Sequence, residues 1–401
     1  MDSKPDGKYE WGDGVFTLLS WFKKEKVKNA RVLVAGAGAL GNEVVKDLAL
    51  FGVGHVFVVD FDEIEMSNLT RSVLFREEDA NAHAYKAEVV ARRASEINPQ
   101  IQVTPIVGDL FSEVGLGIYR SVDVVIGCLD SRIARYRLNR LCLRAGKAWI
   151  DGSIENLTGT VTVYTPGINC YECGLTRDEF NSIMLRTGCA DVVRTQTVAG
   201  RIATTPISAS IIGAMQVQEA LKVIHRGEET SKQFRTLEGC MLHYDGMINS
   251  MRIFKYNSWK RSCTAHEYWE NIISCPNLSA KMTVKDTLSE LKSLLETDAV
   301  EINFRNNKFV DKIVADRTEQ EFDVMMPDSQ VERYINKSSE LRNLSYRNLF
   351  LKSFFVNIDS EFPYQQLTLE QIGIPPFDVI QVTTPNGLSY IELTADQHLY
   401  L

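Results

Sequence analysis

Residues 31–60 read RVLVAGAGALGNEVVKDLALFGVGHVFVVD, and this stretch decides the fold class. Two runs rich in β-branched residues, 31–36 and 55–60, enclose a segment whose apolar residues recur at helical spacing. Residues 85–98 again carry apolar residues at helical spacing, and further strand-like runs lie at 101–106, 123–130 and 147–152. The alternation predicts an α/β fold with a doubly wound, mostly parallel, Rossmann-type sheet whose strands are buried on both faces. Ligands of such sheets bind outside the carboxyl ends of the strands.

Length and composition limit the class of protein further. The 401 residues correspond to two or three domains, and 44 Lys and Arg against 52 Asp and Glu give a net charge of −8, which argues against a nucleic-acid partner. The N-terminus lacks the apolar core of a signal peptide, and polar residues interrupt the apolar stretch 202–224, so we expect a buried helix there and no membrane partner. Eight cysteines are too few for a disulfide scaffold, and we expect a cytoplasmic protein.

A glycine-rich loop follows the first strand. Gly36, Gly38 and Gly41 open the helix, and small residues in this position let a phosphate approach the backbone and the helix N-terminus. Asp60 ends the second strand, 19 residues beyond Gly41, where a carboxylate can accept hydrogen bonds from ribose hydroxyls. An NAD-dependent oxidoreductase would show the same features, and the glycines could instead serve only close packing of helix on sheet. The loop predicts nucleotide binding without choosing the nucleotide.

Three charged residues favour ATP over NAD. Arg71 and Lys86 follow Asp60, and Asp130 lies at the end of the fourth strand-like run. Negative charge on the phosphates of ATP grows during acyl transfer, and cations stabilise it, whereas hydride transfer needs no such cluster. Asp130 is placed to hold Mg²⁺, which prefers carboxylate and phosphate oxygens. Each residue alone has an ordinary explanation: Arg71 as a surface cation, Lys86 as a solvated helix residue and Asp130 as a helix N-cap. The combination predicts ATP and Mg²⁺.

With these segments the chain resembles the adenylating enzymes that activate ubiquitin-like proteins, the ThiF/MoeB/HesA-type superfamily. Over about residues 30–270 it is similar to bacterial sulfur-carrier adenylyltransferases and to the catalytic subunits of heterodimeric eukaryotic activating enzymes. The resemblance implies ATP- and Mg²⁺-dependent adenylation of the C-terminal glycine of a ubiquitin-like protein. It implies these site residues: Gly36, Gly38 and Gly41 in the phosphate loop, Asp60 at the ribose with Asp62 as a further nucleotide contact, Asn68, Arg71 and Lys86 at the phosphates, and Asp130 at the metal.

Two departures from the family pattern bear on the site. Ser72 stands where the family usually has glutamine after the arginine, so the resemblance does not imply the nucleotide contact of that glutamine here. Bacterial homodimers also carry an N-terminal arginine that reaches the neighbouring subunit's site, but no arginine precedes Arg31 here. Either Lys23 or Lys24 replaces it in a homodimer, or a different partner chain supplies it in a heterodimer.

Two pairs of metal-ligand residues occur far apart in the sequence. Cys170 and Cys173 form one pair and Cys263 and His266 the other, and the two intervening residues let a tight turn present both side chains to one Zn²⁺. The first pair alone could be a redox dithiol. Because the resembled family has a structural zinc at the matching place, we expect Zn²⁺ bound by all four residues. A catalytic role is not expected, since four protein ligands leave no open position.

The segment 174–204 shows weak periodicity and is predicted to be irregular, as the crossover of the resembled family is. Cys189 lies in it, and Arg186 and Arg194 nearby could lower the pKa of its thiol. We therefore predict that Cys189 forms a thioester with the activated substrate, although an incidental loop cysteine is the alternative. The segment lacks the C-T-x-x-x-x-P pattern of many eukaryotic relatives.

The expected domains are an N-terminal extension (1–28), an adenylation domain (29–275) containing the crossover, and a small α+β domain (280–401). A hairpin is predicted at Pro385-Asn386-Gly387. This last domain resembles, less specifically, the β-grasp-like ubiquitin-fold domain that recruits the conjugating enzyme; a dimerisation module is the alternative. No cysteine follows Cys275, so we expect no rhodanese chemistry in this domain. A sulfur-carrier adenylyltransferase without a thioester step, an NAD-dependent oxidoreductase and a pseudoenzyme scaffold are the alternative functions.

Overall fold

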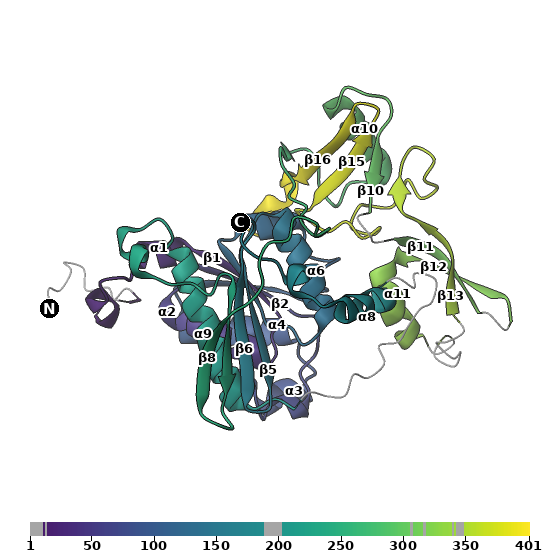
Figure 1. Cartoon of the computed structure of the whole chain (residues 1–401). Helices are drawn as coiled ribbons and strands as arrows, with labels where there is room; N and C mark the ends of the chain where they lie inside the picture. Colours follow the sequence, from purple (N-terminus) through teal and green to yellow (C-terminus); the bar gives the residue numbers. More distant parts are fainter. Residues whose placement is uncertain are drawn as a thin grey trace. The chain divides into compact units, whose positions relative to one another are not determined.

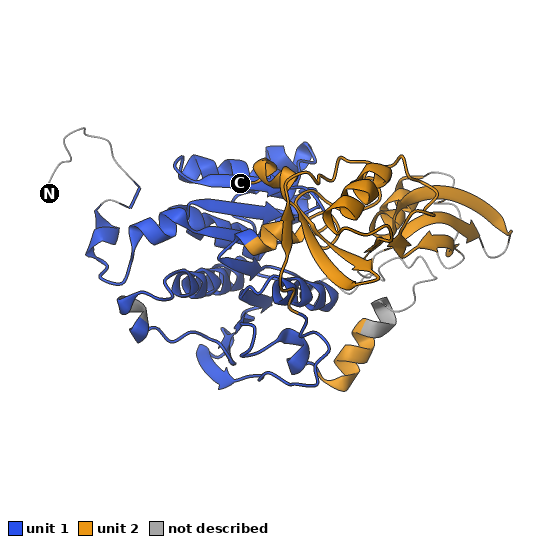
Figure 2. Ribbon diagram, turned by 90° about the horizontal axis from the view of Figure 1, so that it is seen from above, with its two compact units in different colours: residues 1–108, 121–175, 202–267 blue, residues 109–120, 176–201, 268–401 orange. Residues whose placement is uncertain are grey.

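The computed structural model describes residues 11–12, 14–187, 203–304, 308–315, 318–338, 341 and 349–401. The chain divides into two compact units, coloured separately in Figure 2. Unit 1 comprises residues 1–108, 121–175 and 202–267, and unit 2 comprises residues 109–120, 176–201 and 268–401. The functional limits of the domains stay a prediction.

Unit 1 is built on an eight-stranded sheet with the order β3-β2-β1-β4-β5-β6-β7-β8 (Figure 1). The first five strands are parallel and the last three run antiparallel to their neighbours. This sheet confirms the predicted α/β class. Its strands are β1 (Arg31–Ala35), β2 (His55–Val59), β3 (Gln102–Ile106), β4 (Val124–Gly127), β5 (Trp149–Glu155), β6 (Thr158–Tyr164), β7 (Cys240–Asp245) and β8 (Ser250–Lys255).

The helices of unit 1 include the two predicted from the first 100 residues and the predicted buried helix. Thr205 caps α9, since its Oγ1 accepts a hydrogen bond from the N–H of Ser208, and Pro206 occupies the first turn, where its missing N–H costs nothing. No helix in the described part of the chain has the length and apolar character that a membrane span requires. The helices are α1 (Lys24–Asn29), α2 (Ala39–Phe51), α3 (Glu77–Asn81), α4 (Lys86–Ile97), α6 (Arg132–Arg144), α7 (Tyr171–Gly174) and α9 (Pro206–Ile224), with short turns η1 (Val15–Leu18), η2 (Met66–Asn68) and η3 (Glu229–Gln233).

The centre of the sheet is buried on both faces, as predicted. Val32 and Val34 of β1 belong to a core that includes residues of α2, α4 and α9, while Leu33 points to the opposite face and is equally inaccessible. The prediction is wrong for β3, where Gln102 and Pro105 are exposed. This strand is at the edge of the sheet, and Pro105, which cannot donate a ladder hydrogen bond, already indicated an edge strand.

The predicted irregular segment 174–204 contains a helix in its described part. Helix α8 (Arg177–Thr187) begins with a reciprocal capping box: Glu179 N–H donates to Thr176 Oγ1 at 3.3 Å, and Thr176 N–H donates to Glu179 Oε2 at 3.0 Å. The T-x-x-E pattern at 176–179 was the sequence signal for this helix. Residues 188–202, including Cys189, lie outside the described residues.

Unit 2 contains two sheets with separate hydrophobic cores, where the sequence predicted one small α+β domain. The five-stranded sheet has the order β14-β10-β15-β16-β9, and β15 and β16 form the predicted hairpin, in which Thr384 pairs with Gly387. The three-stranded sheet, β12-β11-β13, was not predicted. The elements are α5 (Leu116–Ser121, the last residue in unit 1), β9 (Ile273–Cys275), α10 (Val284–Leu294), β10 (Glu301–Asn303), β11 (Phe309–Ala315), β12 (Gln320–Pro327), α11 (Asp328–Lys337), β13 (Leu349–Phe355), β14 (Asn357–Ile358), β15 (Val379–Thr384), β16 (Gly387–Leu393) and η5 (Thr394–Leu399).

Candidate functional site

The glycine loop connects β1 to α2, and its three glycines have different roles. Gly36 has φ +100°, and a Cβ there would lie 2.5 Å from the carbonyl oxygen of Cys128. A Cβ on Gly41 would lie 2.1 Å from the carbonyl oxygen of Gly36. A Cβ on Gly38 would meet no non-neighbouring heavy atom of the described residues within 4 Å. The packing explanation therefore holds for Gly36 and Gly41, and Gly38 is where the loop faces open space.

Asn42, in the first turn of α2, organises this loop from within the protein. Its Nδ2 donates to the carbonyl oxygens of Ala37 at 2.8 Å and Gly38 at 2.9 Å, and its Oδ1 accepts the N–H of Leu74 at 2.9 Å. The side chain is fully buried. The sequence analysis missed Asn42, although a polar residue directly after Gly41 on a helix predicted to pack against the sheet was a signal.

Asp60 stands beside the loop at the end of β2. Its Oδ2 accepts the N–H of Ala37 at 2.7 Å, and its Oδ1 accepts the N–H of Asp62 at 2.8 Å. Burial raises the pKa of the Asp60 carboxyl, while the charge of Lys86 and the two N–H groups act in the opposite direction. The carboxylate thus fixes the loop backbone; its contact with a ribose stays a prediction.

Lys86 and Asp62, both expected at the nucleotide, form an ion pair with each other. Lys86 is the first residue of α4, and its Nζ lies 2.6 Å from Asp62 Oδ2. The Lys86 N–H also donates to the Asp62 carbonyl oxygen at 2.9 Å. The Lys86 side chain is 13% exposed and that of Asp62 is 51% exposed, so the ammonium group is fixed by a carboxylate that is itself open to solvent.

Arg71 and Asn68 belong to the segment between β2 and α3 and make local contacts. Arg71 Nη1 donates to the carbonyl oxygen of Ser67 at 2.7 Å. Asn68 Oδ1 accepts the N–H of Glu65 at 3.0 Å. Ser72, which replaces the family's glutamine, is buried. These two hydrogen bonds of Arg71 and Asn68 shape their own segment, and the contact of both residues with phosphates stays a prediction.

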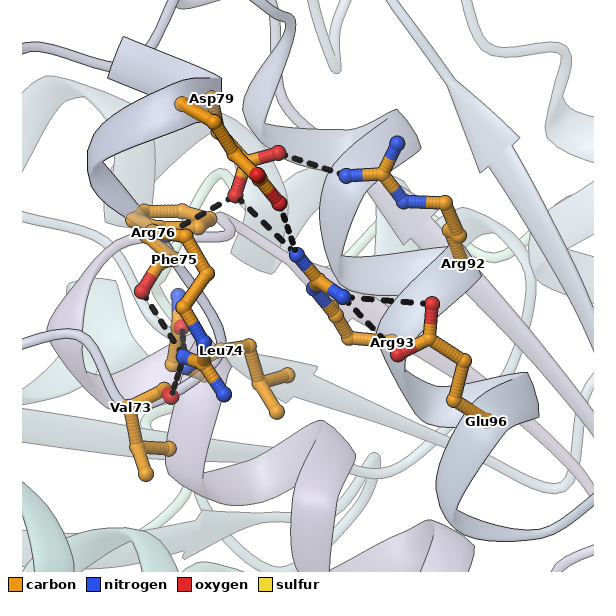
Figure 3. A network of polar contacts seen from close by, with 10 residues as sticks. Val73, Leu74, Phe75, Arg76, Asp79, Arg92, Arg93 and Glu96 are labelled. Atoms are coloured by element: carbon orange, nitrogen blue, oxygen red, sulfur yellow. Dashed lines mark hydrogen bonds and ion pairs between the residues drawn. The ribbon is translucent and has the colours of Figure 1, made fainter.

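A network of charged side chains anchors this segment to α4 (Figure 3). The buried carboxylate of Asp79 accepts the N–H of Arg76 at 2.9 Å and pairs with Arg92 at 2.6 Å. Arg93 lies 3.9 Å from the same carboxylate and also pairs with Glu96 at 3.0 Å. Because Asp79 is paired and hydrogen-bonded, its charge is compensated, and the backbone that follows Arg71 is fixed.

Asp130 lies three residues beyond the end of β4 and is exposed. It does not cap α6, because Ser131 is the N-cap and its Oγ accepts the N–H of Ala134 at 3.0 Å. The ordinary explanation of Asp130 as a helix cap is therefore wrong. An exposed carboxylate at this position suits a hard cation that also binds phosphate oxygens.

A buried ion pair between Arg135 and Asp151 holds the backbone next to Asp130. Arg135 Nε donates to Asp151 Oδ1 at 2.8 Å, and its Nη2 donates to the carbonyl oxygen of Leu129 at 2.6 Å. Burial raises the pKa of Asp151, while Arg135 opposes that shift. The arginine thereby fixes the residue directly before Asp130.

The ends of three neighbouring strands bring the predicted nucleotide residues to one edge of the sheet. Ala35 at the end of β1 pairs with Val59 of β2 and with Gly127 of β4. The glycine loop, Asp60 and Asp130 follow these three paired positions. This is the edge where a doubly wound sheet binds its ligand.

The second candidate centre in unit 1 is a group of four metal-ligand side chains. The ligand atoms of Cys170, Cys173, Cys263 and His266 all lie within 4.8 Å of one another, and Cys173 Sγ is 3.3 Å from His266 Nε2. Ligands at about 2.0–2.3 Å from a tetrahedral Zn²⁺ are about 3.3–3.8 Å apart. Three sulfurs and one imidazole are also the donors that Zn²⁺ prefers, so the four residues fit the ion.

Two arginines of α6 hold both halves of this group. Arg140 makes a bidentate ion pair with Glu172, at 2.8 and 2.9 Å, between the first two cysteines. Arg144 pairs with Glu267, directly after the histidine, at 2.9 Å. The closeness of all four ligand atoms, rather than of the two cysteines alone, suits a single metal ion better than a redox dithiol.

Two other described cysteines, Cys128 and Cys142, are poorly suited to nucleophilic chemistry. Burial raises the pKa of both Cys128 and Cys142, which keeps these thiols protonated near neutral pH. Cys275 is buried in β9, and Cys240 packs partly against the core of unit 1.

Comparison with known proteins gives consistent matches. Residues 16–265 match the ThiF family. "Adenylyltransferase and sulfurtransferase MOCS3" of Anopheles gambiae is 33% identical over 240 residues, 59% of this chain and 50% of that protein. "SUMO-activating enzyme subunit uba-2" of Caenorhabditis elegans is 36% identical over 159 residues, 39% of this chain and 27% of that protein. Escherichia coli MccB crystallised with ATP aligns with a TM-score of 0.48 and 24% identity over 61% of this chain and 68% of that chain. The chain spans about half the length of the MOCS3 relatives that it matches.

Proposed function

The chain belongs to the ThiF family, and we propose that it is an ATP-dependent adenylyltransferase that activates the C-terminal glycine of a ubiquitin-like protein. The observation that carries this proposal is the convergence of Gly38, Asp60 and Asp130 on the ends of three paired strands. The cations Arg71 and Lys86 in the same unit favour a triphosphate over NAD.

The proposed reaction needs positioning and charge neutralisation rather than a protein base. A carboxylate oxygen of the substrate's terminal glycine forms a bond to the α-phosphorus of ATP. The bond from this phosphorus to the bridging oxygen breaks, and pyrophosphate leaves with that electron pair. Backbone N–H groups of the glycine loop, Arg71 and Lys86 neutralise the phosphates. Mg²⁺, which Asp130 would hold, neutralises the leaving pyrophosphate when bound.

Pyrophosphate exchange into ATP tests this proposal. Exchange should require a ubiquitin-like protein with a free C-terminal glycine. Asp130→Ala should lower it by about two orders of magnitude or more, because negative charge develops on the leaving pyrophosphate and the residue that would hold the neutralising metal is lost. Asp298→Ala, which removes an exposed carboxylate from unit 2, is the matched control. Undiminished exchange in Asp130→Ala would remove this residue from the site.

We further propose that Cys189 receives the activated acyl group as a thioester, which is then transferred to a conjugating enzyme. In this step the Cys189 thiolate attacks the acyl carbonyl and AMP leaves. The proposal is supported by the state of the other cysteines, of which Cys128, Cys240 and Cys263 are partly exposed in the described residues. Burial raises the pKa of Cys128, and Cys263 belongs to the metal-ligand group. A thiol-sensitive adduct on a non-reducing gel should disappear in Cys189→Ala and persist in Cys240→Ala.

The MOCS3 relatives favour a second candidate, an adenylyltransferase that activates a sulfur-carrier protein without a thioester step. Pyrophosphate exchange without any thiol-sensitive adduct, even in the wild-type protein, would select it. A substrate-dependent adduct would select the activating enzyme.

We also propose that a partner subunit completes the ATP site. The resemblance to catalytic subunits of heterodimeric activating enzymes supports a heterodimer, with residues 280–401 recruiting the conjugating enzyme. Lys23 and Lys24 remain the homodimer alternative. Full activity of the isolated chain, unchanged by any candidate partner, would contradict the heterodimer.

A further inference from the structure

We infer that Asn42 is a positioning residue that couples the glycine loop to the segment carrying Arg71. This inference rests on the proposed adenylation. The hydrogen bonds of the Asn42 amide are to backbone atoms of the loop and of the Arg71 segment, so the residue acts through the backbone of these two segments. A single buried amide therefore joins two parts of the site that are about 30 residues apart in sequence.

The contacts fix the orientation of this amide. Leu74 offers an N–H, which can only donate, so the Asn42 atom facing it is oxygen. Ala37 and Gly38 offer carbonyl oxygens, which can only accept, so the atom facing them is nitrogen. Each of the two atoms of the amide has partners of one kind, and a flipped amide would lose all three hydrogen bonds.

The two loop contacts determine which backbone groups the loop can offer to a phosphate. With the carbonyl oxygens of Ala37 and Gly38 bound to Asn42, neither oxygen is available to face the phosphate and repel it. The peptide group between Gly36 and Ala37 is held as well, since the N–H of Ala37 donates to Asp60. The loop is thus preorganised before ATP arrives, which increases affinity because no ordering is required on binding.

The third contact reaches the segment of Arg71. Leu74 is three residues beyond Arg71, and the following Arg76 is fixed by the buried Asp79 (Figure 3). Since the segment is held at Leu74 by Asn42 and at Arg76 by Asp79, its position depends on the first turn of α2. Loss of the Asn42 amide should therefore disturb the loop and the arginine together.

Two substitutions separate the two halves of this coupling. Asn42→Leu has a similar size and loses all three hydrogen bonds. Asn42→Asp keeps an oxygen for the Leu74 N–H and loses both donors to the loop. Asn98→Leu is the matched control, because Asn98 is equally buried and its Nδ2 donates at 2.9 Å to the Ala49 carbonyl oxygen, near the opposite end of α2.

The first measurement is pyrophosphate exchange as a function of ATP concentration, with thermal unfolding of each variant. Both Asn42 variants should raise KM for ATP by about tenfold, the effect of losing the loop hydrogen bonds, with a smaller change in kcat. Asn98→Leu should lower Tm by a comparable amount and leave KM within about twofold. Equal KM values for the Asn42 and Asn98 variants would overturn the inference.

The second measurement is hydrogen exchange at the Leu74 amide, which needs neither ATP nor substrate. Protection should be lost in Asn42→Leu and retained in Asn42→Asp and Asn98→Leu. Retained protection of the Leu74 amide in Asn42→Leu would also overturn the inference, even if the protein catalysed no pyrophosphate exchange. A wild-type protein that catalyses no pyrophosphate exchange into ATP would contradict the proposed function. The hydrogen exchange of the Leu74 amide would still decide whether Asn42 couples the two segments.

Discussion

Lys86 Nζ lies 2.6 Å from Asp62 Oδ2, so a cation and a carboxylate that are both expected at the nucleotide neutralise each other. If Lys86 binds phosphate, Asp62 competes with ATP for the ammonium group. If Asp62 itself contacts the nucleotide, its loss weakens binding. The two roles predict opposite effects of one substitution.

We predict that Asp62→Asn lowers KM for ATP by about two- to fivefold, the range that an exposed ion pair of up to about 1 kcal/mol supports. Lys86→Met should raise KM, because the phosphate then loses its cation. The backbone hydrogen bond from Lys86 to Asp62 is independent of both side chains, so α4 should keep its start. ATP-dependent exchange kinetics measure both effects, and an increased KM in Asp62→Asn would assign this carboxylate to the nucleotide.

The glycines of the loop should respond differently to alanine. Gly41→Ala places a methyl group 2.1 Å from the Gly36 carbonyl oxygen and should destabilise the protein by at least about 3 kcal/mol. Gly38 has φ −73° and open space around its Cβ position, so Gly38→Ala should change the free energy of unfolding by less than about 1 kcal/mol.

Gly38→Ala should nevertheless raise KM for ATP, because the methyl group occupies the space through which a phosphate approaches the loop. Thermal unfolding and exchange kinetics on the same samples distinguish the two substitutions. A normal KM in a stable Gly38→Ala protein would place the phosphates elsewhere.

Much of the fold was predictable because it depends on local patterns. The period of apolar residues predicted β1, β2, β4 and β5 with the helices α2, α4 and α9, and the Pro-Asn-Gly turn predicted the β15–β16 hairpin. Two errors also had local signals that were not used, Pro105 in the edge strand β3 and the T-x-x-E box before α8. The three-stranded sheet had none of comparable strength, since the pairing of β11 with β13 joins residues about 40 positions apart.

The candidate site was predictable in its residue types but not in its contacts. Strand ends identified Asp60 and Asp130, because parallel strands bring their carboxyl ends to one edge. Sequence could not show that Asp62 pairs with Lys86 or that Asn42 holds the loop. Such contacts depend on positions within a few tenths of an ångström, which only the packed structure determines.

Removal of the proposed zinc should destabilise the protein rather than alter its chemistry. We predict one Zn²⁺ per chain, and Cys173→Ser should abolish it and lower the unfolding free energy by several kcal/mol, because metal binding contributes to folding. Cys240→Ser, a partly exposed cysteine outside the group, is the control. The measurements are elemental analysis of protein purified without chelator and thermal unfolding. A wild-type protein that contains no zinc and is no more stable than Cys173→Ser would refute the site.

Acid should destabilise unit 1 through His55. This side chain is 7% exposed, and its Nε2 lies 2.9 Å from Thr104 Oγ1. Burial, with a smaller contribution from the charge of Arg31, lowers the pKa of His55 from an ordinary value near 6.5 to about 4. Between these values the unfolded chain binds a proton that the folded protein does not. The free energy of unfolding should therefore be unaffected by this group above about pH 6.5 and fall as the pH decreases toward 4, by about 1.4 kcal/mol per pH unit.

The contribution of His55 is measured by comparison with His55→Gln. The difference in unfolding free energy between the wild-type protein and this variant should be constant above about pH 6.5. As the pH falls to 4, the wild-type protein should lose up to about 3 kcal/mol of unfolding free energy relative to the variant. Burial also lowers the pKa of His225, but that residue is present in both proteins and cancels in the difference. His83→Gln, at an exposed position, controls for the substitution itself. Parallel curves for wild type and His55→Gln would show that His55 keeps its proton in the folded protein, and that the Thr104 contact accommodates the charged ring.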